Sequence, residues 1–214
     1  MNEVKYNIRP LLRWLLLSEG GVKAEGCDDS ELKPAYEKNR KKMFANDPKD
    51  RGGATLCGVT YHTFGAATKD DDYDHFLQMS YEQWARIVER LYWNPTHAGE
   101  YGSLPLALVT ADFAFNSGVP TAARKLQDAL NRVNDYNCHR FGDALVTDGI
   151  IGKKTLGMIQ QMPEQVRLVV CAVLTYLRRD YLRTCVANGG IHKKFEKGLL
   201  RRSEQALMEA MDSY

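Results

Sequence analysis

Apolar residues recur at helical spacing along most of this 214-residue chain, and this periodicity constrains the fold more than any other feature. Asn7 can cap the first such helix, which ends at Gly20-Gly21. Its apolar stripe is formed by Ile8, Leu11, Leu12, Leu15 and Leu16. We therefore predict a mainly α protein that begins with a helix.

The later parts of the chain repeat the pattern. Ser80 and Gln83 form a capping box, and an apolar stripe follows until Pro95. Pro105 opens another helix that closes at Gly118. We predict further helices over residues 122–133, 155–160, 164–185 and 193–211.

Two segments depart from this pattern. Residues 22–46 are rich in Lys, Glu and Asp, with few large apolar residues, so we interpret them as an inserted loop or a short exposed helix. Residues 47–60, DPKDRGGATLCGVT, combine Pro, three Gly, Asp and Thr, which predicts tight turns and at most one small hairpin.

Composition excludes several classes of protein. Hydrophobic residues make up 44% and charged residues 26%, as in ordinary soluble proteins. A formal charge of +2 is too small to indicate a nucleic-acid partner. No apolar run approaches the length of a membrane span, and the LLRWLLL run at residues 11–17 is too short and too interrupted for a signal peptide. We expect synthesis in the cytoplasm.

The sulfur and imidazole side chains indicate neither a metal site nor a cofactor. The five cysteines are odd in number and form no CxxC pair, which fits a reducing compartment. The histidines stand far apart, and DGIIG at residues 148–152 lacks the alternating ligands of a calcium loop. Cys57 with His62 could form a thiol nucleophile pair, but a buried Cys57 is the favoured interpretation.

Glu19 is the first candidate for acid chemistry. A carboxylate at a helix C-terminus faces the negative end of the macrodipole, which disfavours its ionised form and suits a general acid. Taken alone, Glu before Gly-Gly is more often a solvated helix end. Asp47, Asp50, Thr55 and Thr60 add oxygen-bearing side chains on the glycine-rich segment, although Asx turns explain part of that pattern.

Four motifs together point to a family. They are EGG at residues 19–21, DPKDRGGATLCGVT at 47–60, YWNP at 92–95 and DFAFNSG at 112–118. The combination resembles glycoside hydrolase family 108. LQDAL at 126–130, DGIIGKKTL at 148–156 and FEKGLLRRSEQAL at 195–207 look like that family's C-terminal peptidoglycan-binding region.

The resemblance implies a lysozyme-like helical domain over residues 1–118, with an insertion at 22–46, and a packed helical peptidoglycan-binding region over 119–214. It implies hydrolysis of the β-1,4 bond between N-acetylmuramic acid and N-acetylglucosamine, and Glu19 matches the family's proposed catalytic acid. The family places its two first motifs closer together, so we expect the insertion to lie beside the cleft and alter substrate choice. A looser likeness to phage-type lysozymes assigns Asp50 to orienting water or stabilising charge, and Thr55 to holding the nucleophilic water.

The substrate contacts that we predict are Thr60, Trp93, Asp112 and Asn116. Asp112 and Asn116 lie four residues apart and so share one helix face, where they could line the cleft or face solvent as an ordinary polar pair. Tyr92 belongs to the buried stripe, whereas Trp93 is expected to be exposed for stacking on a sugar ring.

Other functions remain open at this point. The chain could be a peptidoglycan-binding secretion or assembly factor with little activity, or a lytic transglycosylase. The basic cluster around residues 192–202 could contact anionic wall groups or be the wet face of a helix. We expect a monomer that reaches the cell wall or periplasm through a holin or another export route, in a phage or a bacterial context, with inversion and retention both open.

Overall fold

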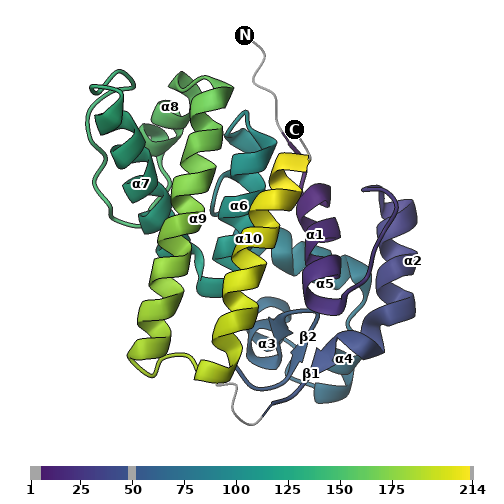
Figure 1. Cartoon of the computed structure of the whole chain (residues 1–214). Helices are drawn as coiled ribbons and strands as arrows, with labels where there is room; N and C mark the ends of the chain where they lie inside the picture. The colour runs from purple at the N-terminus through teal and green to yellow at the C-terminus, as the bar shows by residue number, and fades with distance from the viewer. Residues whose placement is uncertain (1–5, 48–51, 213–214) are drawn as a thin grey trace. The chain divides into compact units, whose positions relative to one another are not determined.

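The computed structural model describes residues 6–47 and 52–212, and it is built mainly of helices with one small sheet (Figure 1). The predicted mainly α, lysozyme-like fold class is confirmed. Contacts divide the chain into two compact units. We call Ile8–Leu91 the N-terminal unit and the rest of the chain the C-terminal unit.

The N-terminal unit contains short helices around a three-stranded sheet. Its elements are α1 (Arg9–Gly20), α2 (Asp29–Asn39), the 3-10 helix η1 (Arg40–Met43), β1 (Phe44–Ala45), β2 (Thr55–Leu56), β3 (Val59–Thr60), α3 (Tyr61–Thr68), α4 (Tyr73–Leu77) and α5 (Tyr81–Val88). The predicted first helix is confirmed, but Ile8 and not Asn7 occupies the N-cap position. The Ser80–Gln83 capping box at α5 is also confirmed.

The small sheet is antiparallel in the order β1-β2-β3. Thr55 pairs with both Ala45 and Thr60. Cys57 and Gly58 connect β2 to β3 with φ values of 47° and 74°. Two successive positive φ values are typical of the tight turn that matches the twist of a two-residue hairpin.

Residues 22–46 contain a short helix, which was one of our two interpretations, but the structure corrects the exposure that we expected for it. α2 packs against α1 and α5, and Leu32 and Tyr36 have no exposed surface. The Tyr36 ring stacks on Trp84 with 5.2 Å between centroids, and its hydroxyl donates to the Met79 carbonyl at 3.0 Å. Leu32, Tyr36 and Met43 belong to the core of the N-terminal unit, whereas Phe44 is exposed.

The C-terminal unit is a bundle of longer helices. Its elements are η3 (Ala98–Glu100), α6 (Leu104–Ser117), α7 (Val119–Tyr136), α8 (Lys153–Gln161), α9 (Glu164–Ala187), η4 (Lys193–Phe195) and α10 (Glu196–Asp212), while the π-helix η2 (Glu89–Trp93) spans the boundary between the units. All the helices that we predicted here are present. α6 is the central one: every residue from 105 to 114 is buried, and the helix packs against α7, α9 and α10.

The boundary between the two compact units therefore falls after Leu91 and not at residue 118, because α6 belongs to the same unit as α7, α9 and α10. Our functional division into residues 1–118 and 119–214 stays a prediction. No helix within residues 6–47 or 52–212 has the length and apolar character that crossing a membrane requires.

Candidate active site

The EGG motif forms the corner at which α1 ends. Gly21 has a φ of 62°, a conformation that favours glycine. Its N–H donates to the Leu17 carbonyl at 2.8 Å, and the N–H of Val22 donates to the Leu16 carbonyl at 3.1 Å. These two bonds are the C-terminal capping pattern that satisfies the last carbonyls of a helix. Glu19 consequently lies, half-buried, in the final turn of α1.

Gly20 is required for a different reason, which is close packing. A Cβ atom at this position would lie 2.5 Å from Cγ and 2.7 Å from Sδ of Met43. Met43 ends η1, directly before β1, and its carbonyl accepts a hydrogen bond from the Cys57 N–H at 3.0 Å. The corner that carries Glu19 therefore lies against the residue that joins η1 to the sheet.

Thr55 lies on the central strand of that sheet. Its side chain is half-buried, and its hydroxyl donates across the ladder to the Ala45 carbonyl at 3.4 Å, a long hydrogen bond. Met43 thus links the Glu19 corner and the strand that carries Thr55 within one compact unit. Asp50, the third predicted catalytic residue, lies outside the described residues.

Thr60 has a structural role that accounts for its hydroxyl. It is the N-cap of α3, where its Oγ1 accepts from the Thr63 N–H at 3.0 Å and lies 2.8 Å from the Thr63 hydroxyl. Such a cap contributes about 1 kcal/mol to the stability of a helix. Its predicted substrate contact stays a prediction.

Cys57 has the environment of a core residue. Its side chain has no exposed surface, and its carbonyl accepts a hydrogen bond from Trp84 Nε1 at 3.1 Å. His62 lies exposed on α3. A nucleophilic thiol must be accessible to the substrate and must ionise to a thiolate. Full burial prevents access and disfavours the charged thiolate. The geometry therefore disfavours the thiol alternative.

The burial of the two aromatic residues of YWNP is the reverse of what we expected. Trp93, predicted to be an exposed stacking ring, is only 5% exposed. Tyr92 is half-buried, and its ring meets Phe115 edge-on at 5.0 Å between centroids. The exposure predicted for Trp93 is wrong because η2 continues α5 as a π-helix, which changes the angular positions that ordinary helical spacing predicts.

Asp112 is buried in an ion-pair network instead of lining a surface. Its Oδ2 accepts from Arg178 Nη1 at 2.6 Å, and its Oδ1 accepts from Arg202 Nη2 at 2.7 Å. Burial by itself would raise the pKa of Asp112, but the positive charges of Arg202 and Arg178 outweigh burial and hold that pKa well below its usual range. The network joins α6, α9 and α10.

Asn116, one turn further along α6, is half-buried and accepts a hydrogen bond from the neighbouring Ser117 hydroxyl at 3.3 Å. The shared face that we predicted for Asp112 and Asn116 thus runs from a buried carboxylate to a partly accessible amide. The sequence gives no sign of the two arginines, which are 66 and 90 residues away from Asp112.

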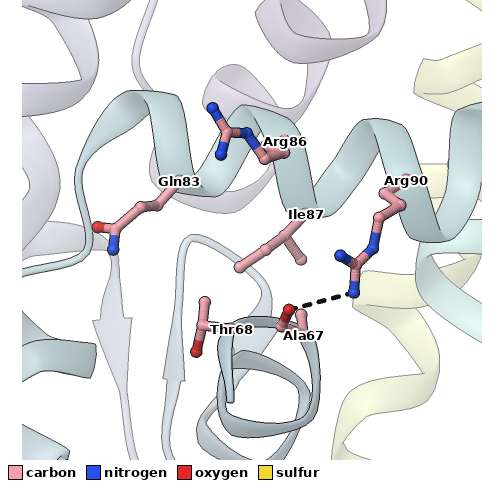
Figure 2. A pocket seen from close by; sticks show the side chains of 6 residues that line it. All are labelled: Ala67, Thr68, Gln83, Arg86, Ile87 and Arg90. Carbon is pink, nitrogen blue, oxygen red and sulfur yellow. Dashed lines mark hydrogen bonds between the residues drawn. The ribbon is translucent and has the colours of Figure 1, made fainter. Parts of the chain in front are cut away.

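A small pocket in the N-terminal unit was not predicted. It has a volume of about 280 Å³, lies between α3 and α5, and is lined by Ala67, Thr68, Gln83, Arg86, Ile87 and Arg90 (Figure 2). Arg90 donates to the Ala67 carbonyl at 3.1 Å. A cation there stabilises the C-terminal end of α3, so a structural role accounts for Arg90. The pocket contains none of the predicted site residues.

Comparisons with known proteins relate the chain to a protein family and to solved structures. The model of the glycosyl hydrolase 108 family matches residues 40–118. The solved structure of Brucella abortus SagA matches with a TM-score of 0.59 and 25% sequence identity, over 79% of this chain and 88% of that chain. No curated protein matches. The family match includes Thr55, Thr60, YWNP and DFAFNSG and begins after the EGG motif. Together these matches confirm the predicted resemblance to the glycosyl hydrolase 108 family, whose model covers residues 40–118, while the C-terminal peptidoglycan-binding region stays a prediction.

Proposed function

We propose that this chain is a muramidase, which hydrolyses the β-1,4 bond between N-acetylmuramic acid and N-acetylglucosamine with Glu19 as general acid. The observation that carries the proposal is the packing of the Gly20 corner on Met43, because it holds the end of α1 against η1, directly before the sheet in the region that the glycosyl hydrolase 108 model matches. One carboxyl and one hydroxyl of the predicted site thereby belong to the same compact unit.

The proposed reaction needs a proton donor and an activated water. Glu19 donates its proton to the glycosidic oxygen as the bond from that oxygen to the anomeric carbon breaks. A water held by Thr55 adds to the anomeric carbon, and Asp50 orients this water or stabilises the positive charge that develops on the sugar. The proton that the water loses passes to a carboxylate of the site, which balances the reaction.

We propose fewer substrate contacts than the sequence suggested. Asp112 and Trp93 are buried, so they support the C-terminal unit from within. Asn116 is partly accessible and keeps its proposed contact with sugar. We also retain the proposal that residues 119–214 bind peptidoglycan and that the chain acts on the cell wall or in the periplasm after export.

Analysis of the products released from purified peptidoglycan tests this function. A muramidase creates new reducing ends on muramic acid. Anhydro-muramic ends would replace the proposal with a lytic transglycosylase, and freed peptide stems would replace it with an amidase or a peptidase. Intact peptidoglycan after binding would favour a secretion or assembly factor.

A further inference from the structure

A groove in the C-terminal unit gathers positive charge. It has a volume of about 500 Å³ and lies between α9 and the η4–α10 segment. We call it the basic groove, and its lining includes Arg179, Lys193, Lys197, Leu200 and Arg201, with Glu196 and Glu204 as the acidic members.

Three of these cations form a row. Lys193, Lys197 and Arg201 recur every four residues. Lys193 opens the 3-10 helix η4, and Lys197 and Arg201 lie one turn apart on α10, where four residues rise about 6 Å along one helix face. None of the three has an ion-pair partner within the part of the chain that the structure describes. Like charges at this spacing destabilise a helix. The stability of the fold therefore does not account for the row.

The charge of this segment is also out of proportion to that of the chain. Five of the eleven residues from 192 to 202 are Lys or Arg and one is Glu, whereas the whole chain carries a formal charge of only +2. Arg202 turns inward to Asp112, which leaves the other cations on the outer side. Such local concentration attracts anions through the field it creates.

One contact inside the groove pairs a cation with a carboxylate of the chain itself. Arg179 Nη1 lies 2.6 Å from the carboxylate of Glu204, an ion pair with the chemistry that would recognise a carboxylate ligand. Leu200 adds apolar surface beside the cations. Carboxylates on alternate residues of an extended peptide lie about 7 Å apart, close to the spacing of the row. The chemistry therefore fits a short extended peptide that carries carboxylates and small apolar side chains.

We propose that the basic groove binds the carboxylates of the peptide stems of peptidoglycan and so retains the enzyme on its polymer. The inference rests on the proposed function, because it takes the wall polymer as the substrate. It adds a second site, in the C-terminal unit, that recognises the peptide part of the polymer.

Cosedimentation with insoluble peptidoglycan tests the groove directly. The test variant is Lys193→Gln/Lys197→Gln/Arg201→Gln. The matched control is Lys69→Gln/Arg140→Gln/Arg183→Gln, which removes the same charge from three exposed side chains outside the groove and outside the motifs that resemble the peptidoglycan-binding region. Each protein is measured on intact peptidoglycan, on glycan from which an amidase has removed the stems, and on polyphosphate as a phosphate-bearing polyanion.

We expect the test variant to bind intact peptidoglycan about tenfold more weakly than the control, the combined effect of three exposed charge interactions. The unmodified chain should bind stripped glycan more weakly than intact peptidoglycan by the same factor. Added salt should reduce the difference in affinity between the test and control variants. Equal binding by the test and control variants, or equal binding to intact and stripped glycan, would overturn the proposal. Tighter binding to polyphosphate than to peptidoglycan would overturn it in favour of a phosphate polymer.

The failure of this inference is distinguishable from the failure of the proposed function. If binding depends on the row but no sugar products are released, the proposed role of the groove stands and the proposed muramidase activity is contradicted. If both variants release muramic reducing ends at equal rates and bind with equal affinities, the proposed muramidase activity stands and the proposed role of the groove is contradicted.

Discussion

Arg178 donates a 2.6 Å hydrogen bond to Asp112 between two side chains that are 1% and 0% exposed. Removing one partner of such a pair leaves an uncompensated charge in the interior. We therefore expect Asp112→Ala to lower the free energy of unfolding by about 3–5 kcal/mol, measured by urea denaturation. A loss below about 1 kcal/mol, the size of an exposed pair, would contradict the network.

Asp128→Ala provides the matched control. Asp128 pairs with Arg132 on the surface of α7, at 3.0 Å and with side chains that are 32% and 55% exposed. Solvent screens this pair, so its loss should cost less than about 1 kcal/mol. The contrast between the two substitutions isolates the effect of burial.

The contribution of Asp112 to stability should depend on pH. The pKa of Asp112 is lowered in the folded protein, so the unfolded chain takes up a proton at a higher pH than the folded chain does. The stabilisation from Asp112 is complete above the ordinary aspartate pKa and is lost as pH falls towards the folded value. Asp112→Asn should therefore flatten the decline of the unfolding free energy below about pH 4. An unchanged acid slope in a folded variant would exclude this contribution.

α2 should be indispensable to the N-terminal unit. Tyr36→Ala removes a stacked, fully buried ring and should cost about 3–5 kcal/mol, whereas Tyr36→Phe removes only the hydrogen bond to Met79 and should cost about 1 kcal/mol. Replacing residues 23–44 by a Gly/Ser linker should abolish cooperative unfolding of this unit in calorimetry. A shortened protein with native stability would restore the interpretation of the segment as an insertion.

The contact between Gly20 and Met43 should couple packing to activity. Gly20→Ala forces the Met43 side chain to move and shifts the turn that carries Glu19. Because a displacement of about 1 Å can cost a hundredfold in rate, we expect a large loss of glycan cleavage. Adding Met43→Ala should recover part of that loss.

Gly157→Ala is the control for this experiment, because it lies in helix α8 with open space around the added methyl group. It should leave activity unchanged and stabilise the protein by about 0.5–1 kcal/mol. An unchanged rate in folded Gly20→Ala protein would show that the corner does not position the acid.

Local rules predicted much of the fold. Helix periodicity and caps predicted α5 and α6, because Ser80, Gln83 and Gly118 act within a few residues of their own helices. The glycine-rich segment predicted the hairpin of β2 and β3 for the same reason, whereas the third strand, β1, was not predicted. These signals need no knowledge of distant partners.

Long-range packing was the part that local rules missed. Tyr36 lies in a charged segment, and its burial depends on Trp84, 48 residues later in the sequence. Asp112 looked like a surface polar residue because its two arginines are distant in sequence. Trp93 was misplaced because a π-helix changes the period on which the prediction relied. The candidate acid Glu19 was found from its motif, which the chain expresses locally as a helix end.

Glu19→Gln tests the central claim most directly, because it preserves the shape of the side chain and removes its proton. Release of muramic reducing ends is measured together with cosedimentation and thermal unfolding, and Glu25→Gln, at an exposed position shortly after the corner, serves as control. We predict that Glu19→Gln protein folds with a stability within about 1 kcal/mol of the original, still binds peptidoglycan and releases almost no product, while the control keeps full activity. Near-normal cleavage by well-folded Glu19→Gln protein would contradict the proposed mechanism.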